Sequence, residues 1–149
     1  MTIGAVRPMR AADAAEVARL SGELGYPARS EEIEERFARL ADDPKERIFI
    51  AEDGAEHVRG WLHVRAGFDL TGPAQAEVRG LVVDADHRGR GIGRRLLEAA
   101  EAWAVVRGCR AMKVRSNTIR TRARTFYERA GYEVTKTQHQ FRKPLAEPR

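Results

Sequence analysis

The amino-acid sequence predicts an α/β fold in which a mixed central β-sheet is flanked by about four helices. Three observations predict it: two amphipathic stretches with helical spacing near the start, a β-rich hairpin after them, and alternating strand and helix patterns in the second half. A length of 149 residues is typical of one domain, so we expect residues 1–149 to form a single domain with one site.

The first half is predicted to contain two helices and a hairpin. Asp13 can cap the first helix, and Gly25 is expected to end it because a Tyr-Pro pair follows. Ser30 can cap the second helix, which begins with acidic residues that favour the helix dipole. The β-rich runs 48–52 and 58–64 surround an Asp-Gly turn, which predicts that they pair as an antiparallel hairpin.

The second half is predicted to alternate strands with helices. The elements expected here are a strand over 77–83, a helix over 91–107, a strand over 112–114, a helix over 123–130 and a β-prone segment over 132–143. Gly80 interrupts the first of these strands. A glycine inside a strand often marks a β-bulge or a close approach of the backbone to a ligand.

Charge is divided unevenly along the chain. Residues 1–85 hold 11 Lys/Arg and 16 Asp/Glu, whereas residues 86–149 hold 16 and 6. The basic second half suits an anion, either nucleic acid or a phosphorylated cofactor, and the acidic first half is free to meet a cationic substrate. Charge alone does not choose between these partners, and a solvated surface is the third interpretation.

Several classes of protein are excluded by composition. Cys109 is the single cysteine, so no internal disulfide can form, and no Cys/His cluster has the spacing of metal ligands. No apolar run is long enough to span a bilayer, and the first residues do not resemble a secretion signal. We therefore expect a soluble, cytoplasmic protein that binds neither a metal nor a membrane.

The segment Arg88-Gly89-Arg90-Gly91-Ile92-Gly93 lies between a predicted strand and a predicted helix. Amide N–H groups at a helix start attract phosphate, and glycines let an anion approach the backbone closely. The segment lacks the Gly-Lys-Ser/Thr ending of a nucleoside triphosphate loop, and Arg94 stands where a dinucleotide fingerprint has its third glycine. An anion site and a tight turn with solvated arginines both fit these residues.

The same segment fits the pattern of the GNAT acetyltransferases, which is Gln or Arg, two residues, Gly, one residue, then Gly or Ala. The preceding strand, the following helix with Leu96 and Leu97, and the later Phe126-Tyr127 fall in the order of that family. The chain thus resembles the GNAT superfamily over nearly its whole length. Gly25-Tyr26-Pro27, the run 60–64 and Lys136-Thr137-Gln138 resemble its aminoglycoside acetyltransferase-like subgroup.

The resemblance implies a GNAT fold in which a bulge splays the central strands so that the arm of acetyl-CoA enters between them. It implies that backbone groups of Leu81, Val82 and Val83 line the pantetheine. It also implies a set of residues that wraps the pyrophosphate: Arg88, Gly89, Arg90, Gly91, Ile92, Gly93 and Arg94. Asn117 is expected either to contact the pantetheine or to serve only as a helix cap.

Acetyl transfer to an amine requires that the amine lose a proton and that the leaving thiolate gain one. By resemblance, Glu77 is the general base, directly or through water, although a strand carboxylate can also be a plain partner for an arginine. Tyr127 matches the family's proton donor, with a core aromatic as the alternative. A backbone N–H near Val83 is expected to hold the carbonyl oxygen as negative charge develops.

The predicted reaction is direct transfer of the acetyl group of acetyl-CoA to a primary amine, with a small molecule as the favoured acceptor and a peptide or protein as the alternative. A non-catalytic acetyl-CoA sensor is a further alternative. A nucleic-acid-binding module is less favoured, because Arg120, Arg122 and Arg124 do not share a helical face.

Family members often pair subunits, which implies that this chain can form a homodimer. The glutamates over 31–35 are interpreted as a solvated helix face rather than as a site for a polycation.

Overall fold

The computed structural model describes residues 3–23, 25–116, 118 and 120–147. They form two compact units, one that ends at Arg115 and one that begins at Ser116. The elements of the first unit are β1 (Ile3–Pro8), η1 (Ala11–Asp13), α1 (Ala14–Glu23), α2 (Ser30–Leu40), β2 (Glu46–Asp53), β3 (Val58–Gly67), β4 (Gln75–Val83), η2 (Ala85–His87), α3 (Ile92–Val106) and β5 (Met112–Val114). The second unit contains α4 (Thr121–Arg129).

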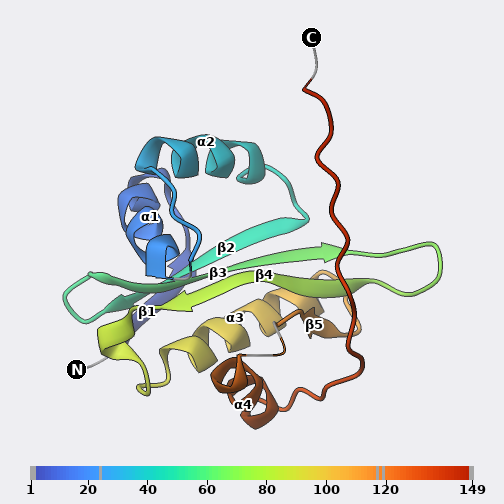
Figure 1. Cartoon of the computed structure of the whole chain (residues 1–149). Helices are drawn as coiled ribbons and strands as arrows, with labels where there is room; N and C mark the ends of the chain where they lie inside the picture. The colour runs from blue at the N-terminus through green and yellow to red at the C-terminus, as the bar shows by residue number, and fades with distance from the viewer. Residues whose placement is uncertain (1–2, 24, 117, 119, 148–149) are drawn as a thin grey trace. The chain divides into compact units, whose positions relative to one another are not determined.

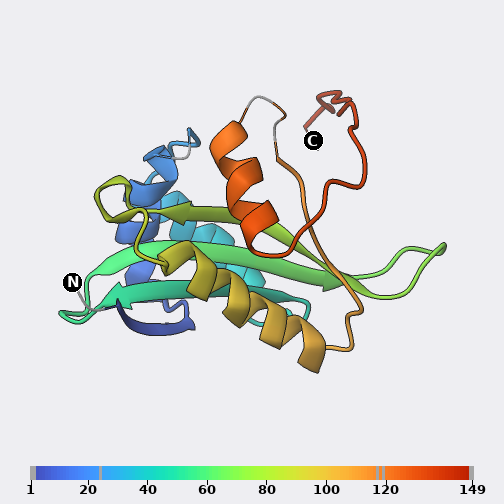
Figure 2. The same ribbon diagram turned by 90° about the horizontal axis from the view of Figure 1, so that it is seen from below.

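The first unit is built on a five-stranded sheet in the order β1-β2-β3-β4-β5. The first four strands pair as antiparallel neighbours, and β5 joins β4 in parallel. Helices α1 and α2 lie on one face of this sheet and α3 lies on the other (Figures 1 and 2). The sheet is therefore mixed and is covered by helices on both faces.

Strand β3 shows how the two faces are divided. Leu62 and Val64 are fully buried toward α3, whereas Trp61 and His63, which alternate with them, lie on the face of α1 and α2. Gly60 lets α3 approach closely, because a Cβ there would lie 2.9 Å from the carbonyl oxygen of Val82 and 3.1 Å from Leu96 Cδ1. The close packing of α3 on β3 thus depends on a glycine at residue 60, which has no Cβ to fill this contact.

Apolar side chains hold α1 and α2 against the sheet. The buried residues of this cluster are Met9, Val17, Leu20, Ile48, Ile50, Val58 and Val82, and Ile33, Phe37, Leu40 and Trp61 pack against it partly buried. The helix stripes predicted from sequence spacing supply several of these residues. Burial of this area is the main force that fixes both helices.

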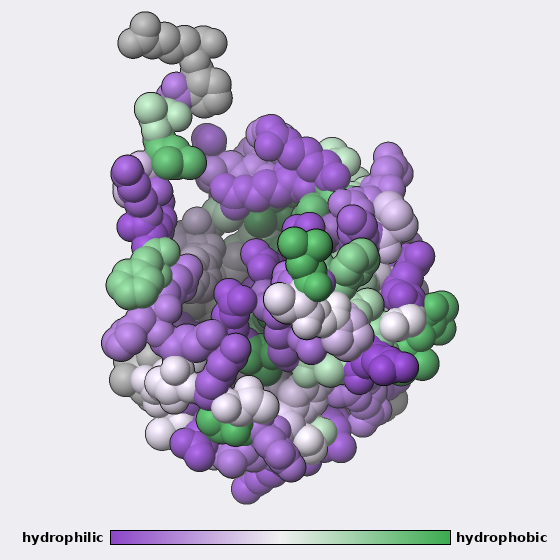
Figure 3. Space-filling model, turned by 90° about the vertical axis from the view of Figure 1, so that its right-hand side faces the viewer, coloured by the Kyte–Doolittle hydropathy of each residue, from purple (hydrophilic) through white to green (hydrophobic). Residues whose placement is uncertain are grey.

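The surface of the described residues is largely polar. Seen from the side that carries the loop between β3 and β4, hydrophobic colour forms separate patches among hydrophilic residues (Figure 3). Phe68 and Leu70, at 77% and 107% exposure, are the most exposed large apolar residues of that loop. No helix among residues 3–23, 25–116, 118 and 120–147 is long and apolar enough to cross a membrane.

The second unit begins at Ser116, and α4 is its one regular element among the described residues. The ring of Tyr127 meets Phe126 edge-on at 5.0 Å and Tyr132 at 5.8 Å between centroids. Gly131 has a φ of 96°, a left-handed conformation that favours glycine and ends the helix. The predicted stop of this helix is confirmed.

Most elements expected from the sequence are confirmed with small shifts at their ends: the hairpin, the interrupted strand, the long helix, the short strand after it and the last helix. Two expectations were wrong or incomplete. Strand β1 was not predicted, because it has little β-type alternation of its own and forms by pairing with the edge of β2. The β-prone segment over 132–143 forms no strand in the structure. Its apolar residues Val134 and Phe141 are exposed, so no burial against a partner stabilises an extended pairing there.

Asp13 also differs from its predicted role. Its carboxylate accepts a hydrogen bond from the N–H of Arg10, which precedes it, at 2.7 Å, rather than from the helix that follows. Arg7 pairs with the same carboxylate at 2.8 Å. Asp13 therefore fixes the entry into α1 by holding the chain before the helix.

Replacing Gly60 by Ala should lower the free energy of unfolding by about 1–3 kcal/mol, because the added methyl group overpacks the contact between β3 and α3. Urea denaturation followed by circular dichroism measures this change. Gly67→Ala is the matched control, since it lies in the same strand and its Cβ would meet no atom within 4 Å. Equal midpoints for the two variants would contradict the close-packing role of Gly60.

Candidate active site

A β-bulge divides β4 into two parts. His63 of β3 pairs with Gly80, but the next residue, Val64, pairs with Val78, so Arg79 is the extra residue. Strand β5 pairs only with Ala76, Glu77 and Val78. From Arg79 to Val83, β4 therefore has β3 on one side and, within the described chain, no strand on the other. The bulge that the sequence predicted at Gly80 is confirmed.

Gly80 has a packing role as well as a place in the bulge. A Cβ at this residue would lie 2.9 Å from the ring of Trp61, so the glycine leaves room for that side chain on the α1 and α2 face. Val82 on the same face is buried, while Leu81 and Val83 are half-buried. The backbone of the segment predicted to line pantetheine thus runs along an edge that has no strand partner among the described residues.

The glycine-rich segment connects β4 to α3. Gly89 and Gly91 have φ angles of 79° and 81°, which turn the chain sharply into the helix. Gly91 is the residue that precedes α3, and no side chain caps the helix there. The N–H of Arg95 bonds to the carbonyl of Gly91 at 3.1 Å, so the amides of residues 92–94 precede the first intrahelical bond. These amides lie at the uncapped helix start where the sequence predicts an anion site.

Arginine side chains surround this helix start. Arg88 and Arg90 are exposed, and within the described chain no hydrogen bond or ion pair is found for either. Arg94 pairs with Glu98 at 3.3 Å, and Arg95 donates to the carbonyl of Gly4 at 3.1 Å. Arg88 and Arg90 are accordingly the guanidinium groups best placed to meet an added anion.

A buried carboxylate, Asp84, holds the start of this connection. Its side chain accepts a hydrogen bond from the N–H of Asp86 at 3.1 Å, and Arg59 and Arg19 approach it at 3.3 and 3.5 Å. Burial opposes ionisation of Asp84, but the Asp86 N–H and the nearby cations outweigh it and hold the pKa of Asp84 below 3.8. The charge network therefore anchors the chain where it leaves β4.

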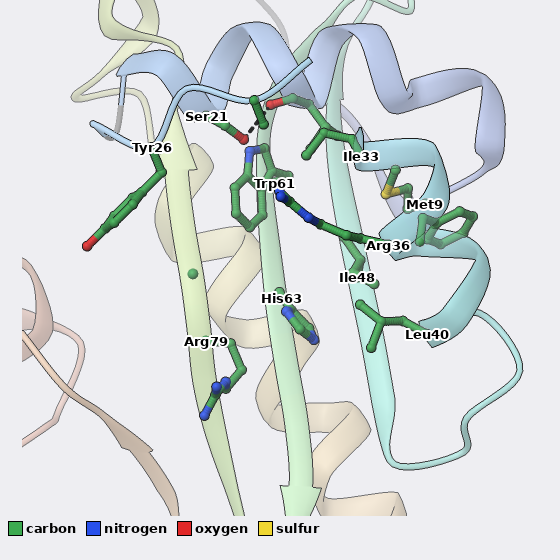
Figure 4. A pocket seen from close by; sticks show the side chains of 14 residues that line it. Met9, Ser21, Tyr26, Ile33, Arg36, Leu40, Ile48, Trp61, His63 and Arg79 are labelled. Carbon is green, nitrogen blue, oxygen red and sulfur yellow. Dashed lines mark hydrogen bonds between the residues drawn. The ribbon is translucent and has the colours of Figure 1, made fainter. Parts of the chain in front are cut away.

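A cavity of about 400 Å³ lies between the helices α1 and α2 and the sheet (Figure 4). Trp61 and His63 of β3 and Arg79 and Gly80 of β4 form part of its floor. Arg36 reaches from α2 across the cavity toward Trp61 (Figure 4). Gly80 belongs both to this cavity and to the bulge, so the cavity opens beside the segment of β4 that β5 does not pair.

Glu77, the predicted base, lies on β4 two residues before Arg79, and its side chain is 14% exposed. Its carboxylate accepts a hydrogen bond from Arg79 at 2.8 Å, and Lys113 and Arg115 lie at 3.8 and 3.7 Å. The alternative interpretation of Glu77 as a partner for arginine is thus realised in the structure. A role as base requires that this cluster of cations loosen around the carboxylate.

His63 is a cavity residue to which the sequence analysis assigned no role. Its Nε2 lies 3.0 Å from Oε2 of Glu46, a buried carboxylate that Arg65 also approaches at 3.6 Å. The register of the hairpin predicts this contact, because Ile48 pairs with His63 and Glu46 pairs with Arg65. Glu46 and His63 are therefore diagonal neighbours on one face of the sheet.

Tyr127 belongs to the second unit, where burial raises its pKa to about 12, so its phenol stays protonated at neutral pH. Asn117 lies outside the described residues. Burial also raises the pKa of the Cys109 thiol, which agrees with a packing role for this residue and not with that of a nucleophile.

Comparison with known proteins agrees with this architecture. Residues 14–132 match the sequence profile of the Acetyltransferase (GNAT) family. The chain is 30% identical over 144 residues to an aminoglycoside N(6')-acetyltransferase type 1 from Stenotrophomonas maltophilia, covering 94% of this chain and 93% of that protein.

Solved structures share the fold at lower identity. The aminoglycoside N-acetyltransferase AAC(6')-Iy in complex with CoA superposes with a TM-score of 0.85 at 17% identity, over 97% of this chain and 98% of that chain. Glucosamine-6-phosphate N-acetyltransferase from Arabidopsis thaliana gives 0.80 at 18% identity, over 95% and 99%. The family match and the relative that is 30% identical identify the chain as an acyltransferase. The chain belongs to the GNAT acetyltransferase family.

Replacing Asp84 by Asn should lower the free energy of unfolding at pH 7 by about 1–3 kcal/mol, since buried donors lose a charged acceptor. The folded pKa of Asp84 lies below its ordinary value, so its stabilisation is present above about pH 4 and is lost as pH falls through the folded pKa. The difference between wild type and variant should therefore shrink in acid.

Chemical denaturation between pH 3 and pH 7 tests this dependence. Asp86→Asn is the control, because Asp86 lies in the same short turn but is exposed. If the two variants lose the same stability, the anchoring role of Asp84 is wrong.

Proposed function

We propose that this protein transfers the acetyl group of acetyl-CoA directly to a primary amine on a small molecule. The observation that carries the proposal is the backbone edge of β4 over 79–83, which lacks a strand partner within the described chain and leads directly into the uncapped, glycine-rich start of α3. A backbone edge suits an amide-containing arm, and a helix start suits a pyrophosphate.

The residues present fit acetyl-CoA at both of these places. Backbone groups of Leu81, Val82 and Val83 would pair with the pantetheine amides, as an added strand does. The pyrophosphate would be held by the segment from Arg88 to Arg94, with amides at the helix start and guanidinium groups as donors. When bound, acetyl-CoA supplies an acetyl group that is activated as a thioester. Asn117 stays a predicted pantetheine contact.

The acceptor amine is proposed to enter the cavity between the sheet and the helices α1 and α2. Gly80 lines this cavity and is part of the bulge, so an amine bound there lies beside the strand that would hold the thioester. The Stenotrophomonas maltophilia relative is named for acetylation of an aminoglycoside, which supports a small-molecule amine in preference to a protein acceptor.

Two side chains are proposed to move protons as the N–C bond forms and the C–S bond breaks. Glu77 would take the proton that the attacking amine loses, directly or through water. Tyr127 would donate the proton that the leaving thiolate gains. Burial raises its pKa to about 12, so the phenol is protonated at neutral pH but is a weaker acid than an exposed tyrosine. A single functional domain, a cytoplasmic location and a homodimer stay predictions.

Acetyl-CoA should raise the melting temperature of the protein at concentrations where mixed-sequence DNA at physiological salt has no effect. Differential scanning fluorimetry with the two ligands tests the cofactor and the competing nucleic-acid hypothesis together. Stabilisation by DNA and not by acetyl-CoA would favour the nucleic-acid-binding hypothesis over the acetyltransferase.

Gly91→Glu should weaken acetyl-CoA binding by roughly a hundredfold or more relative to Gly91→Gln, because a carboxylate would stand where the pyrophosphate charge is held. Both side chains impose the same strain at residue 91, whose φ is 81°, so the comparison isolates charge. Calorimetric titration measures the two affinities, and circular dichroism checks folding. Equal affinities would place the pyrophosphate elsewhere.

Tyr127→Phe should lower turnover strongly while leaving acetyl-CoA affinity nearly intact, since it removes one hydroxyl and little packing.

Glu77→Gln should lower turnover by roughly a hundredfold to ten-thousandfold if the carboxylate is the base. Its rate should recover in part as pH rises, because more of the acceptor amine is already deprotonated. Release of free CoA, measured across pH, tests both variants, and wild-type rates would remove these catalytic roles.

A further inference from the structure

The cavity between the sheet and the helices α1 and α2 has an unusual charge for an amine site. Its lining consists of Met9, Val17, Ser21, Tyr26, Ala28, Ile33, Arg36, Phe37, Leu40, Ile48, Trp61, His63, Arg79 and Gly80. Two of these side chains carry guanidinium groups and one carries an imidazole, but none carries a carboxylate. A polycationic amine would meet like charge in such a cavity.

Two carboxylates beside the cavity offset part of this charge, because Glu77 accepts a hydrogen bond from Arg79 at 2.8 Å and Glu46 lies 3.0 Å from His63. Arg36 is the lining cation with the longest carboxylate contact, at 3.6 Å from Glu32. The four glutamates at the start of α2, which could have attracted a cation, are absent from the lining. Glu31, Glu34 and Glu35 are exposed, and Glu32 pairs with Arg36 of the same helix and with Arg29, which precedes the helix. Their interpretation as a solvated helix face fits this placement.

Both arginines keep donors for a ligand. Arg36 lies 3.6 Å from Glu32, which is longer than a hydrogen bond, and its side chain extends across the cavity (Figure 4). Arg79 donates to Glu77 through Nη1 at 2.8 Å. Because a guanidinium group has five N–H donors in a planar fork, each arginine can still bind a carboxylate or a phosphate through two oxygens.

The rest of the lining limits the size and polarity of the ligand. Apolar side chains from α1, α2 and β2 form most of the remaining wall, and Trp61 contributes an aromatic surface. A volume of about 400 Å³ lies within the range of small-molecule sites and suits one compact ligand with an apolar part.

We propose that the acceptor is a small primary amine that also carries an anionic group, a carboxylate or a phosphate, which Arg36 binds in this cavity, with Arg79 as a second cation of the lining. The inference rests on the proposed acetyltransferase function and names the class of its acceptor. It separates this chain from the aminoglycoside relative, because aminoglycosides carry several amines and no such group. The amine would then lie toward Gly80 and the bulge of β4.

Matched acceptors test the inference. An amino acid, its carboxamide and the corresponding diamine share one carbon skeleton and differ in the charge of the second group, and an aminoalkyl phosphate distinguishes phosphate from carboxylate. We expect kcat/KM for the best anionic amine to exceed that of its neutral analogue by about tenfold to a hundredfold, as for hydrogen bonds to a charged group. An aminoglycoside should be a poorer acceptor still.

Arg36→Gln and Arg39→Gln form a matched pair of variants. Both arginines lie on α2, both are largely exposed and each pairs with a glutamate four residues earlier, but only Arg36 lines the cavity. Arg36→Gln should abolish the preference for the anionic amine by raising its KM, with a much smaller change in KM for the neutral amine. Arg39→Gln should keep the wild-type preference. Arg79→Gln should act like Arg36→Gln on KM, although its contact with Glu77 can also change kcat.

Calorimetric titration of the same amines into protein saturated with CoA separates the inference from the proposed function. Tighter binding of the anionic amines that is lost in Arg36→Gln supports the inference, even if no acetyl transfer is seen. The absence of acetyl transfer to every amine would overturn the proposed function. Acetylation that favours the diamine or the aminoglycoside overturns the inference and leaves the function standing. An equal loss for every amine in Arg36→Gln also overturns it.

Discussion

The architecture of the candidate site depends on one irregularity, the β-bulge at Arg79 in β4. The extra residue directly follows Val78, the last residue of β4 that pairs with β5, and from there to Val83 the strand keeps β3 alone as a partner within the described chain. Backbone N–H and C=O groups seek partners, so an edge of this kind is a place for a ligand with amide groups. The same bulge brings Gly80 to the floor of the cavity and lets the Trp61 ring pack over it.

Charge is then organised around that strand. At its carboxyl end, buried Asp84 with Arg59 and Arg19 fixes the connection to α3, whose uncapped start is the proposed pyrophosphate site. On the cavity face, guanidinium groups dominate and the acidic residues are engaged with cations or turned to the surface. The first 85 residues carry a net negative charge, yet the charged groups in the mostly apolar lining of the cavity are the guanidinium groups of Arg36 and Arg79. Overall charge is therefore a poor guide to the acceptor, which depends on the side chains that line one space.

Sequence reasoning predicted the fold well where local chemistry is strong. The glycines at 80, 89 and 91 marked the bulge and the turn into α3, and apolar spacing predicted both helix faces. Strand β1 was missed because it depends on pairing with β2, and a strand was wrongly expected over 132–143 because β-propensity does not supply a partner. The Glu46–His63 pair and the arginine-lined cavity could not be predicted without the register of the sheet, which brings together residues distant in sequence. The roles of Glu77 and Tyr127 stay predictions.

The central claim is that the backbone edge of β4 and the start of α3 hold acetyl-CoA. Hydrogen exchange measured by mass spectrometry, with and without saturating acetyl-CoA, tests this claim most directly because it reports on backbone amides. We expect slower exchange in the segments 80–83 and 89–95 when acetyl-CoA is present, with α2 changing little. Unchanged exchange in both segments, together with protection elsewhere in the chain, would contradict the account.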